Sequence, residues 1–390
     1  MFGEPKINGV YNNILETIGW TPLVRLHKIE RFFKLDNELY AKLEAFNPGG
    51  SIKDRIAVYM LMKAEEDGRV AKGSVVIEPT AGNTGVGLAL VSRVKGYQTV
   101  FTLPRKMSLE KELLLRSLGA LIIRTPTEAP FYSPLSYYTA AHILRKMILK
   151  RGRMIDREEL TMIVNELQSI IDSGDEETLK NLMEEEVPEG PYAYVPDQYF
   201  NEYNPLAHYE TLAREIWRQM NGKLDIFVAG MGTGGTITGV SRYLKEQKSD
   251  ITVVGVDPKG SIFHIVKDGV SPEEAMKYAH PYLVEGIGED ILPETIDLNL
   301  VDKVIVVDDE KAFAMTRLIA KQEGILAGGS SGAALYGAVK YLKDNNISGR
   351  RVVIIFPDTG RNYLTKIYND EWMRENGFNT CDEEVLKELI

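Results

Sequence analysis

One lysine lies where its amine could act as a nucleophile. Ser51-Ile52-Lys53-Asp54 fits a capping-box pattern before an apolar-periodic stretch, which places Lys53 in the first turn of a helix. The positive end of the helix dipole and burial both favour a neutral amine. A neutral lysine can form an imine with an aldehyde and later take a proton from carbon. Most single lysines are simply exposed, so this hypothesis depends on other residues.

A glycine-rich loop provides the second chemical group, an anion site. The stretch Gly230-Met231-Gly232-Thr233-Gly234-Gly235-Thr236 follows a strand pattern and opens a helix, and none of its residues is charged. Backbone N–H groups in such a loop can form a nest for a phosphate. The loop lacks the lysine of a nucleoside-triphosphate site. Its G-x-G-x-x-G spacing also leaves open a dinucleotide site, with Asp257 as the best ribose partner.

Two further loops carry polar groups at helix starts. In Glu78-Pro79-Thr80-Ala81-Gly82-Asn83-Thr84-Gly85, hydroxyl and N–H groups could bind a carboxylate, and the Asn83 amide could donate to a phenolate-type oxygen. In Gly328-Gly329-Ser330-Ser331-Gly332, a hydroxyl could face a pyridine nitrogen. Each loop alone is equally explained as a helix cap. Together with Lys53 and the glycine loop, they predict a pyridoxal-phosphate enzyme.

The elements that must position these loops alternate between strand and helix. Seven short, mostly β-branched runs predict buried strands at 74–77, 99–103, 121–125, 225–229, 251–256, 303–307 and 351–356. Helical patterns follow several of them, at 84–95, 108–118, 237–247 and 331–345. This alternation predicts an α/β fold in which parallel sheets have helices on both faces.

The domain boundaries are predicted from changes in this rhythm. We expect an N-terminal segment at 1–45 on the larger domain, a smaller mobile domain at 46–150, a helical insertion at 151–190, a larger cofactor-binding domain at 191–370 and a tail at 371–390. The insertion is charged and has helical spacing, so we expect a surface hairpin between the two halves. The acidic end of the tail is expected to be peripheral.

The composition narrows the class of protein. The 390 residues carry a net charge of −10, which argues against a nucleic-acid-binding surface over the whole chain. No apolar run approaches the roughly 18 residues of a membrane helix, and residues 1–5 lack secretory features. Cys381 is the only cysteine, and the five histidines show no metal-ligand spacing. We therefore expect a metal-free cytoplasmic protein.

The loops, in this order, resemble those of the cysteine synthase / cystathionine β-synthase family, enzymes of fold type II, the tryptophan synthase β-like fold. The resemblance covers about 13–370, apart from the insertion. Ile18-Gly19-Trp20-Thr21-Pro22-Leu23-Val24 is similar to the family's N-terminal signature. Asn47-Pro48-Gly49-Gly50-Ser51-Ile52-Lys53-Asp54-Arg55 is similar to its cofactor-lysine motif, which is highly specific.

The resemblance implies a role for each candidate residue. Lys53 would be the catalytic Schiff-base lysine, Asn83 the partner of the cofactor's ring oxygen, and Ser330 the pyridine-nitrogen contact. The phosphate cradle would consist of Gly232, Thr233, Gly234, Gly235 and Thr236. The substrate site would consist of Thr80, Ala81, Gly82, Thr84, Gln198 and Gly286, the last within a Glu285-Gly286-Ile287-Gly288 segment that is similar to a family segment close to the substrate.

Other features of the sequence bear on the choice of substrates. Several stretches are closer to cystathionine β-synthases than to plain cysteine synthases. They include Arg105-Lys106-Met107-Ser108, Asp197-Gln198-Tyr199 and Glu285–Gly288. Two residues depart from the family pattern: Ala81 stands where the family usually has serine, and Glu289 where cystathionine β-synthases tend to have tyrosine. Both departures concern the substrates rather than the cofactor.

The implied reaction is β-replacement on serine, O-acetylserine or O-phosphoserine. Lys53 would remove the α-proton, the β-substituent would leave, and a thiol would add, giving cysteine from sulfide or cystathionine from homocysteine. A homodimer is also implied by the resemblance. Two alternatives to this reaction stay open: a dehydratase of the same fold that releases pyruvate and ammonia, and a cofactor-bound regulatory protein without turnover.

Overall fold

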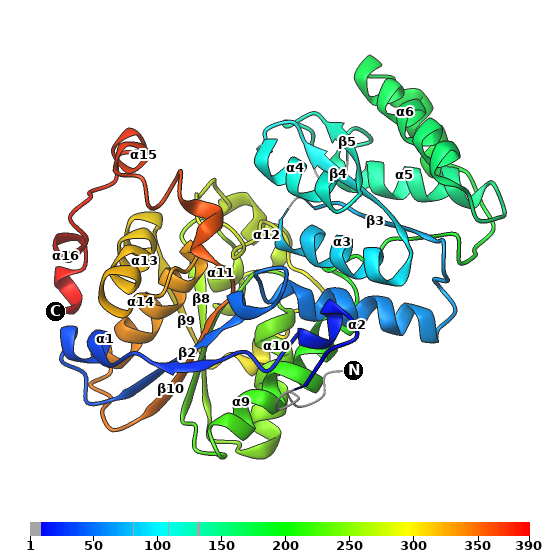
Figure 1. Ribbon diagram of the computed structural model, residues 1–390. Coiled ribbons are helices and arrows are strands. Elements are labelled where there is room, and N and C mark those ends of the chain that lie inside the picture. The colour runs from blue at the N-terminus through cyan, green and yellow to red at the C-terminus, as the bar shows by residue number, and fades with distance from the viewer. Residues whose placement is uncertain (1–8, 81, 108, 131–132) are drawn as a thin grey trace. The chain divides into compact units, whose positions relative to one another are not determined.

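The computed structural model describes residues 9–390 except 81, 108 and 131–132 (Figure 1). Its described residues form two compact units. The larger unit contains Ile18–Ile52 and Asn204–Ile390, and the smaller unit contains Val10–Thr17 and Lys53–Tyr203. The chain therefore passes from the larger to the smaller unit between Ile52 and Lys53.

The larger unit is built on a six-stranded sheet of order β1-β2-β10-β7-β8-β9. Its strands are β1 (Leu23–Arg25), β2 (Glu38–Leu43), β7 (Ile226–Gly230), β8 (Thr252–Pro258), β9 (Lys303–Val307) and β10 (Arg351–Phe356). Only the β1–β2 pair of this sheet is antiparallel. The β-branched residues of the central strands suit burial on both faces.

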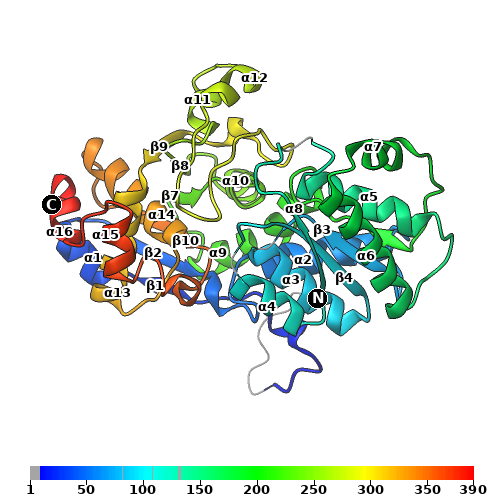
Figure 2. The same ribbon diagram turned by 90° about the horizontal axis from the view of Figure 1, so that it is seen from above.

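Helices cover both faces of this sheet (Figure 2). The helices of the larger unit are α1 (His27–Phe32), α8 (Tyr203–His208), α9 (Arg214–Gln219), α10 (Gly235–Gln247), α11 (Phe263–Lys267), α12 (Pro272–Ala275), α13 (Asp309–Glu323), α14 (Gly329–Asp344), α15 (Asp370–Glu375) and α16 (Asp382–Val385). Because successive strand residues point to opposite faces, Val228 and Ile354 belong to one core and Phe227 and Val353 to the other.

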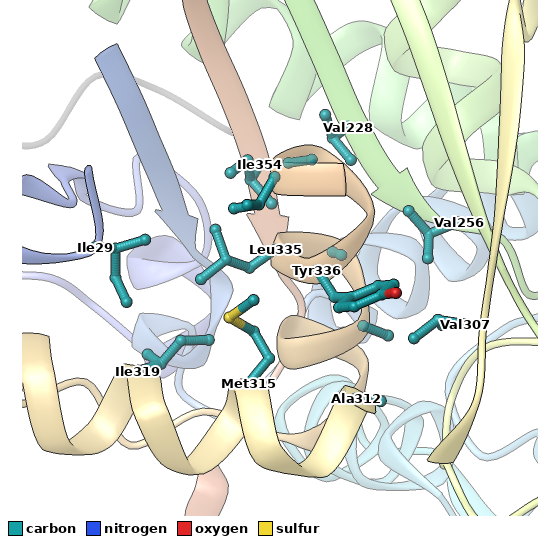
Figure 3. Packing of buried hydrophobic residues seen from close by; sticks show 14 of the residues in the cluster. Ile29, Val228, Val256, Val307, Ala312, Met315, Ile319, Leu335, Tyr336 and Ile354 are labelled. Atoms are coloured by element: carbon teal, nitrogen blue, oxygen red, sulfur yellow. The ribbon is translucent and has the colours of Figure 1, made fainter. Parts of the chain in front are cut away.

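Helix α14 fills the middle of the first of these cores. Figure 3 shows Leu335 and Tyr336 of α14 between the sheet and helix α13, with Val256 on the sheet side and Met315 on α13. All four side chains are almost completely buried. This packing supports the start of α14, where Ser330 lies.

The smaller unit is built on a four-stranded, fully parallel sheet of order β5-β4-β3-β6. Its strands are β3 (Val75–Glu78), β4 (Gln98–Pro104), β5 (Leu121–Thr125) and β6 (Ala193–Tyr194). Its helices are α2 (Lys53–Glu66), α3 (Asn83–Lys95), α4 (Leu109–Ser117), α5 (Tyr137–Leu149), α6 (Arg157–Ser173) and α7 (Glu176–Glu184). The predicted α/β fold with two parallel-sheet regions is therefore confirmed.

The predicted insertion is helical but does not lie between the two halves. Helices α6 and α7 form there, and strand β6, which follows them, completes the sheet of the smaller unit. Leu160, Ile163 and Leu167 of α6 are buried in the same core as α5, and Figure 2 shows α5, α6 and α7 side by side. Because this amphipathic face covers the sheet, the segment is a structural part of the smaller unit.

The end of the chain is also less peripheral than expected. Leu386 and Leu389 are buried in the core of the larger unit. Asp382 is buried as well, and its carboxylate accepts from Arg317 Nε at 3.0 Å and from Lys321 Nζ at 2.5 Å. The acidic composition of this segment did not predict its packing, because the cations that bind Asp382 lie on α13, far away in the sequence. Among the described residues, no helix combines the length and apolar character that a bilayer span requires.

Candidate functional site

Lys53 begins helix α2 and is linked through Gln198 to Thr84 within the smaller unit. Its Nζ lies 3.3 Å from Oε1 of Gln198, and the same oxygen accepts from Thr84 Oγ1 at 2.7 Å. Thr84 and Gln198 are buried, whereas Lys53 is half-buried. These groups come from α2, from α3 and from the segment after β6. The fold therefore brings together three residues that are far apart in the sequence.

The carboxylate of Glu78 holds the segment that carries Gln198. Glu78 ends strand β3, is 1% exposed, and accepts from the backbone N–H groups of Asp197 at 3.0 Å and of Gln198 at 3.3 Å. Burial, with a further contribution from Asp197, raises the pKa of Glu78 to about 8. The site prediction did not include this residue. An acidic residue at the end of an otherwise apolar strand is the signal that could have identified it.

The predicted carboxylate-binding loop opens helix α3. Its backbone enters the helix through Gly82, whose N–H donates to Thr80 Oγ1 at 3.3 Å. Thr80 and Asn83 are half-buried, and Thr84 follows in the first helical turn. Ala81, the departure from the family pattern, lies outside the described residues. The structure thus places Thr80, Gly82, Asn83 and Thr84 together at a helix N-terminus, where the helix dipole favours an anion.

Helices α2 and α3 approach each other closely at Gly87. A Cβ atom at this residue would lie 3.1 Å from the carbonyl oxygen of Lys53 and 3.0 Å from the Cβ of Ala57. A larger residue at 87 would push the two helices apart. Glycine at 87 therefore helps to hold the backbone of Lys53 against the helix that carries Thr84.

The glycine-rich loop of the larger unit joins β7 to α10. Gly234 is the N-cap of α10 with φ +88°, a left-handed conformation that favours glycine. A Cβ at Gly235 would lie 1.9 Å from Oδ1 of Asn204. Asn204 Nδ2 donates to Thr233 Oγ1 at 3.1 Å, and Thr236 Oγ1 lies 3.3 Å from His208 Nε2. Helix α8 therefore holds the loop in place, and glycine is required at both residues.

This loop fits the phosphate group that the resemblance implies. The first intrahelical bond of α10 runs from the N–H of Thr238 to the carbonyl of Gly234. The N–H groups of Gly235, Thr236 and Ile237 consequently have no intrahelical acceptor. An N-cap glycine has no side chain that could occupy them, and the helix dipole adds a partial positive charge. The chemistry and backbone shape of the loop both suit a phosphate.

Two more predicted residues lie in the larger unit. Gly286 lies beside the glycine-rich loop, because a Cβ at Gly232 would be 3.0 Å from the Gly286 carbonyl oxygen. Ser330 is 3% exposed in the first turn of α14. The neighbouring Ser331 hydroxyl is buried and has no hydrogen-bond partner within the described part of the chain. Either serine could supply a hydroxyl to a ring nitrogen, as the sequence suggested.

Asp257 does not fit the dinucleotide alternative. It is completely buried, and its Oδ2 accepts from the backbone N–H of His264 at 2.9 Å and lies 2.7 Å from His264 Nδ1. A carboxylate that binds a ribose must be accessible to it. This aspartate instead anchors the start of helix α11, so the G-x-G-x-x-G spacing has no suitable acidic partner there.

Comparisons with known proteins agree with this chemistry. The family described as "Pyridoxal-phosphate dependent enzyme" matches residues 14–358. The cystathionine beta-synthase of Dictyostelium discoideum is 43% identical over 369 residues, covering 95% of this chain and 64% of the relative. That of Oryctolagus cuniculus is 43% identical over 384 residues, covering 98% and 60%. The chain thus spans less than two thirds of the length of either relative.

A solved structure shares the fold. A hydrogen sulfide-producing enzyme from Fusobacterium nucleatum superposes with a TM-score of 0.71 and 32% sequence identity, covering 94% of this chain and 100% of that chain. The similarity extends over both units, so the fold type II architecture indicated by the sequence is confirmed.

Proposed function

Because this chain belongs to the family of pyridoxal-phosphate-dependent enzymes, we propose that it catalyses β-replacement on a serine-type amino acid by a thiol. The cluster of Lys53, Thr84 and Gln198 is the observation that carries this proposal, since it joins a reactive amine to polar groups suited to a substrate. Relatives named cystathionine beta-synthase support homocysteine as the thiol and cystathionine as the product.

Lys53 has two tasks in this proposal. The cofactor, when bound, supplies an aldehyde for the lysine and a ring that accepts electrons from the substrate α-carbon. The Lys53 amine takes the proton from that carbon, which requires the amine to be neutral when the substrate is in place. The oxygen of Gln198 lies 3.3 Å from the Lys53 amine within the smaller unit.

The remaining residues bind and orient. Thr80, Thr84, Gln198 and the N–H groups at the start of α3 hold the substrate carboxylate, since anions are favoured at a helix N-terminus. The amide of Asn83 would donate to the ring oxygen of the cofactor. Gly232–Thr236 would hold the phosphate, with Gly286 beside them. The hydroxyl of Ser330 would serve the ring nitrogen, a partner that favours its unprotonated form.

A panel of substrate pairs tests the proposed reaction. Serine, O-acetylserine, O-phosphoserine and cysteine are each combined with sulfide and with homocysteine, and the products are identified by mass. We expect cystathionine from homocysteine with at least one of these amino acids. Cysteine is included because the Fusobacterium enzyme is named for producing hydrogen sulfide. Steady release of pyruvate from serine without any thiol would instead establish the dehydratase, and no turnover of any pair would favour the regulatory protein.

We propose a homodimer that is formed through an apolar surface of the larger unit. Phe46 is 66% exposed and Leu326 is 38% exposed, and both line one groove of about 500 Å³. Exposed apolar side chains that share a groove are typical of protein interfaces.

We also propose that the protein acts in the cytoplasm. Its single cysteine suits a reducing compartment, and cell fractionation would test the location.

Replacing Phe46 by aspartate is expected to convert the dimer into monomers. A carboxylate at the centre of an apolar interface loses its hydration without gaining a partner, which costs several kcal/mol. Sedimentation at several concentrations measures the change, and Leu109→Asp, at a residue of α4 that is 65% exposed, is the matched control. A variant at Phe46 that sediments as the wild type does would contradict this interface.

A further inference from the structure

We infer that Glu78 is a positioning residue, which places Gln198 beside Lys53 by holding the backbone N–H groups of Asp197 and Gln198. This inference rests on the proposed function, in which Lys53 and Gln198 act on the substrate. Glu78 has no role there as a group that touches substrate or cofactor. It acts instead through the main chain of the segment that carries Gln198.

The sheet of the smaller unit brings the two segments together. Strand β3 pairs in parallel with β6, with Val75 opposite Ala193 and Val76 opposite Tyr194. Both strands therefore end at the same edge of the sheet. Glu78 is the last residue of β3, and the turn at 197–198 follows β6 by a few residues. The carboxylate spans the interval between these strand ends with bonds of 3.0 and 3.3 Å.

The turn itself has a conformation that needs support. Asp197 has φ +52°, in the left-handed region that is unfavourable for residues other than glycine. Its side chain accepts from Tyr138 Oη at 2.8 Å and from the N–H of Tyr199 at 3.3 Å. Glu78 holds the main chain of the same turn. Without its carboxylate, two N–H groups would lose their acceptors, and the turn would relax toward a less strained conformation.

Such a relaxation would displace the side chain of Gln198. Its Oε1 accepts simultaneously from Thr84 Oγ1 and from Lys53 Nζ, so a shift of the backbone breaks at least one of these contacts. A misplacement of about 1 Å is sufficient to weaken a site of this kind. The effect is specific: the substrate carboxylate loses a partner, while Lys53 keeps its place at the start of α2.

The environment of Glu78 also predicts a pH dependence of stability, which can be measured independently of the kinetics. Asp197 and Tyr194 face the carboxyl group, and Lys53 faces it with the opposite charge. Because burial raises the pKa of Glu78 to about 8, the folded protein holds a proton that the unfolded chain releases near pH 4.5. The stability that this group contributes is complete below pH 4.5 and is lost as the pH rises toward 8.

Steady-state kinetics of the cofactor-loaded enzyme test the positioning role. We expect Glu78→Gln to raise the KM for the amino acid about tenfold, the effect of one disrupted hydrogen bond to a substrate-binding group, with kcat changed less than threefold. The visible band of the cofactor should persist. Because Glu78 acts through Gln198, the double variant Glu78→Gln/Gln198→Ala should have the KM of Gln198→Ala alone.

Two further variants serve as a control and as an independent test of the turn. Glu66→Gln changes the same residue type at the other end of α2, about 20 Å from Lys53, and should leave KM unchanged. Tyr138→Phe removes only the side-chain support of Asp197 and should raise KM by about two- to fivefold. It therefore tests the turn even if Glu78→Gln does not fold.

Stability of the cofactor-free protein separates this inference from the proposed function. We expect the unfolding midpoint of the wild type to decrease as the pH rises from 5 to 8. The decrease should be larger than in Glu78→Gln, because glutamine has no proton to lose. A wild type without a cofactor band at Lys53 would overturn the proposed function but leave this pH comparison intact. An unchanged KM in both Glu78→Gln and Tyr138→Phe, or KM effects that add to that of Gln198→Ala, would overturn the positioning role.

Discussion

Replacement of Lys53 by alanine is expected to abolish the visible absorption band of the bound cofactor and to slow β-replacement at least about 10³-fold. Two effects combine in this loss. Alanine has no amine to join the aldehyde, and the Thr84 and Gln198 side chains that remain cannot take the α-proton in its place. Absorbance spectra of the purified variant, with single-turnover rates, measure both effects.

Lys63→Ala is the matched control for this variant. Lys63 lies on the same helix, about 15 Å from Lys53, and its amine pairs with Glu66 at 2.6 Å. We expect its spectrum and rate to match those of the wild type. A Lys53→Ala protein that retains a wild-type band would show that another amine holds the cofactor, and the proposed role of Lys53 would be wrong.

Replacement of Gly234 by alanine is expected to weaken cofactor binding by about 10- to 100-fold, the loss that accompanies one displaced hydrogen bond to a charged group. A Cβ at this residue would lie 2.3 Å from the Cβ of Ile296 and 2.6 Å from its Cα, which forces the loop or Ile296 to move. The φ of +88° adds strain for any residue with a side chain. We expect the free energy of unfolding to fall by about 2–5 kcal/mol, from overpacking and backbone strain together.

The variant Gly269→Ala separates overpacking from backbone strain. Gly269 has a similar φ of +98°, but apart from its two chain neighbours no heavy atom of the described residues lies within 4 Å of where its Cβ would be. This control should lose only the roughly 1–2 kcal/mol of left-handed strain and should bind cofactor normally. Fluorescence titration of the cofactor and thermal unfolding of the cofactor-free proteins measure both quantities. Equal losses of cofactor affinity in the two variants would contradict a phosphate site at Gly234.

The central strands were predictable because each is a short apolar run with its own signal. The strands at 121–125, 303–307 and 351–356 have the predicted bounds, and the other four differ by one or two residues at each end. Strands β1, β2 and β6 were missed. Ala193–Tyr194 is too short to show a pattern. Glu38–Leu43 alternates polar with apolar residues, which is a strand pattern different from the continuous apolar runs that predicted the central strands.

The positions of the candidate site residues were predictable where they depend on local backbone geometry. A lysine at a helix start and glycine-rich turns between strand and helix can be read from consecutive residues, as at Lys53 and Gly234. The contact from Glu78 to the turn at 197–198 joins residues separated by more than a hundred positions, because β6 returns to pair with β3. The periodicity of apolar residues does not show which strands pair, so the pairing of β6 with β3 is seen only in the folded structure.

The close approach of α2 and α3 also has a consequence for interpreting natural variation. Gly87 is not one of the candidate site residues, yet a methyl group there would press on the carbonyl of Lys53 and the Cα of Asp54 at 3.1 and 3.2 Å. We therefore expect an inherited change from glycine to alanine at this codon to shift the backbone of Lys53 and, under the proposed function, to lower activity although every candidate site side chain is intact.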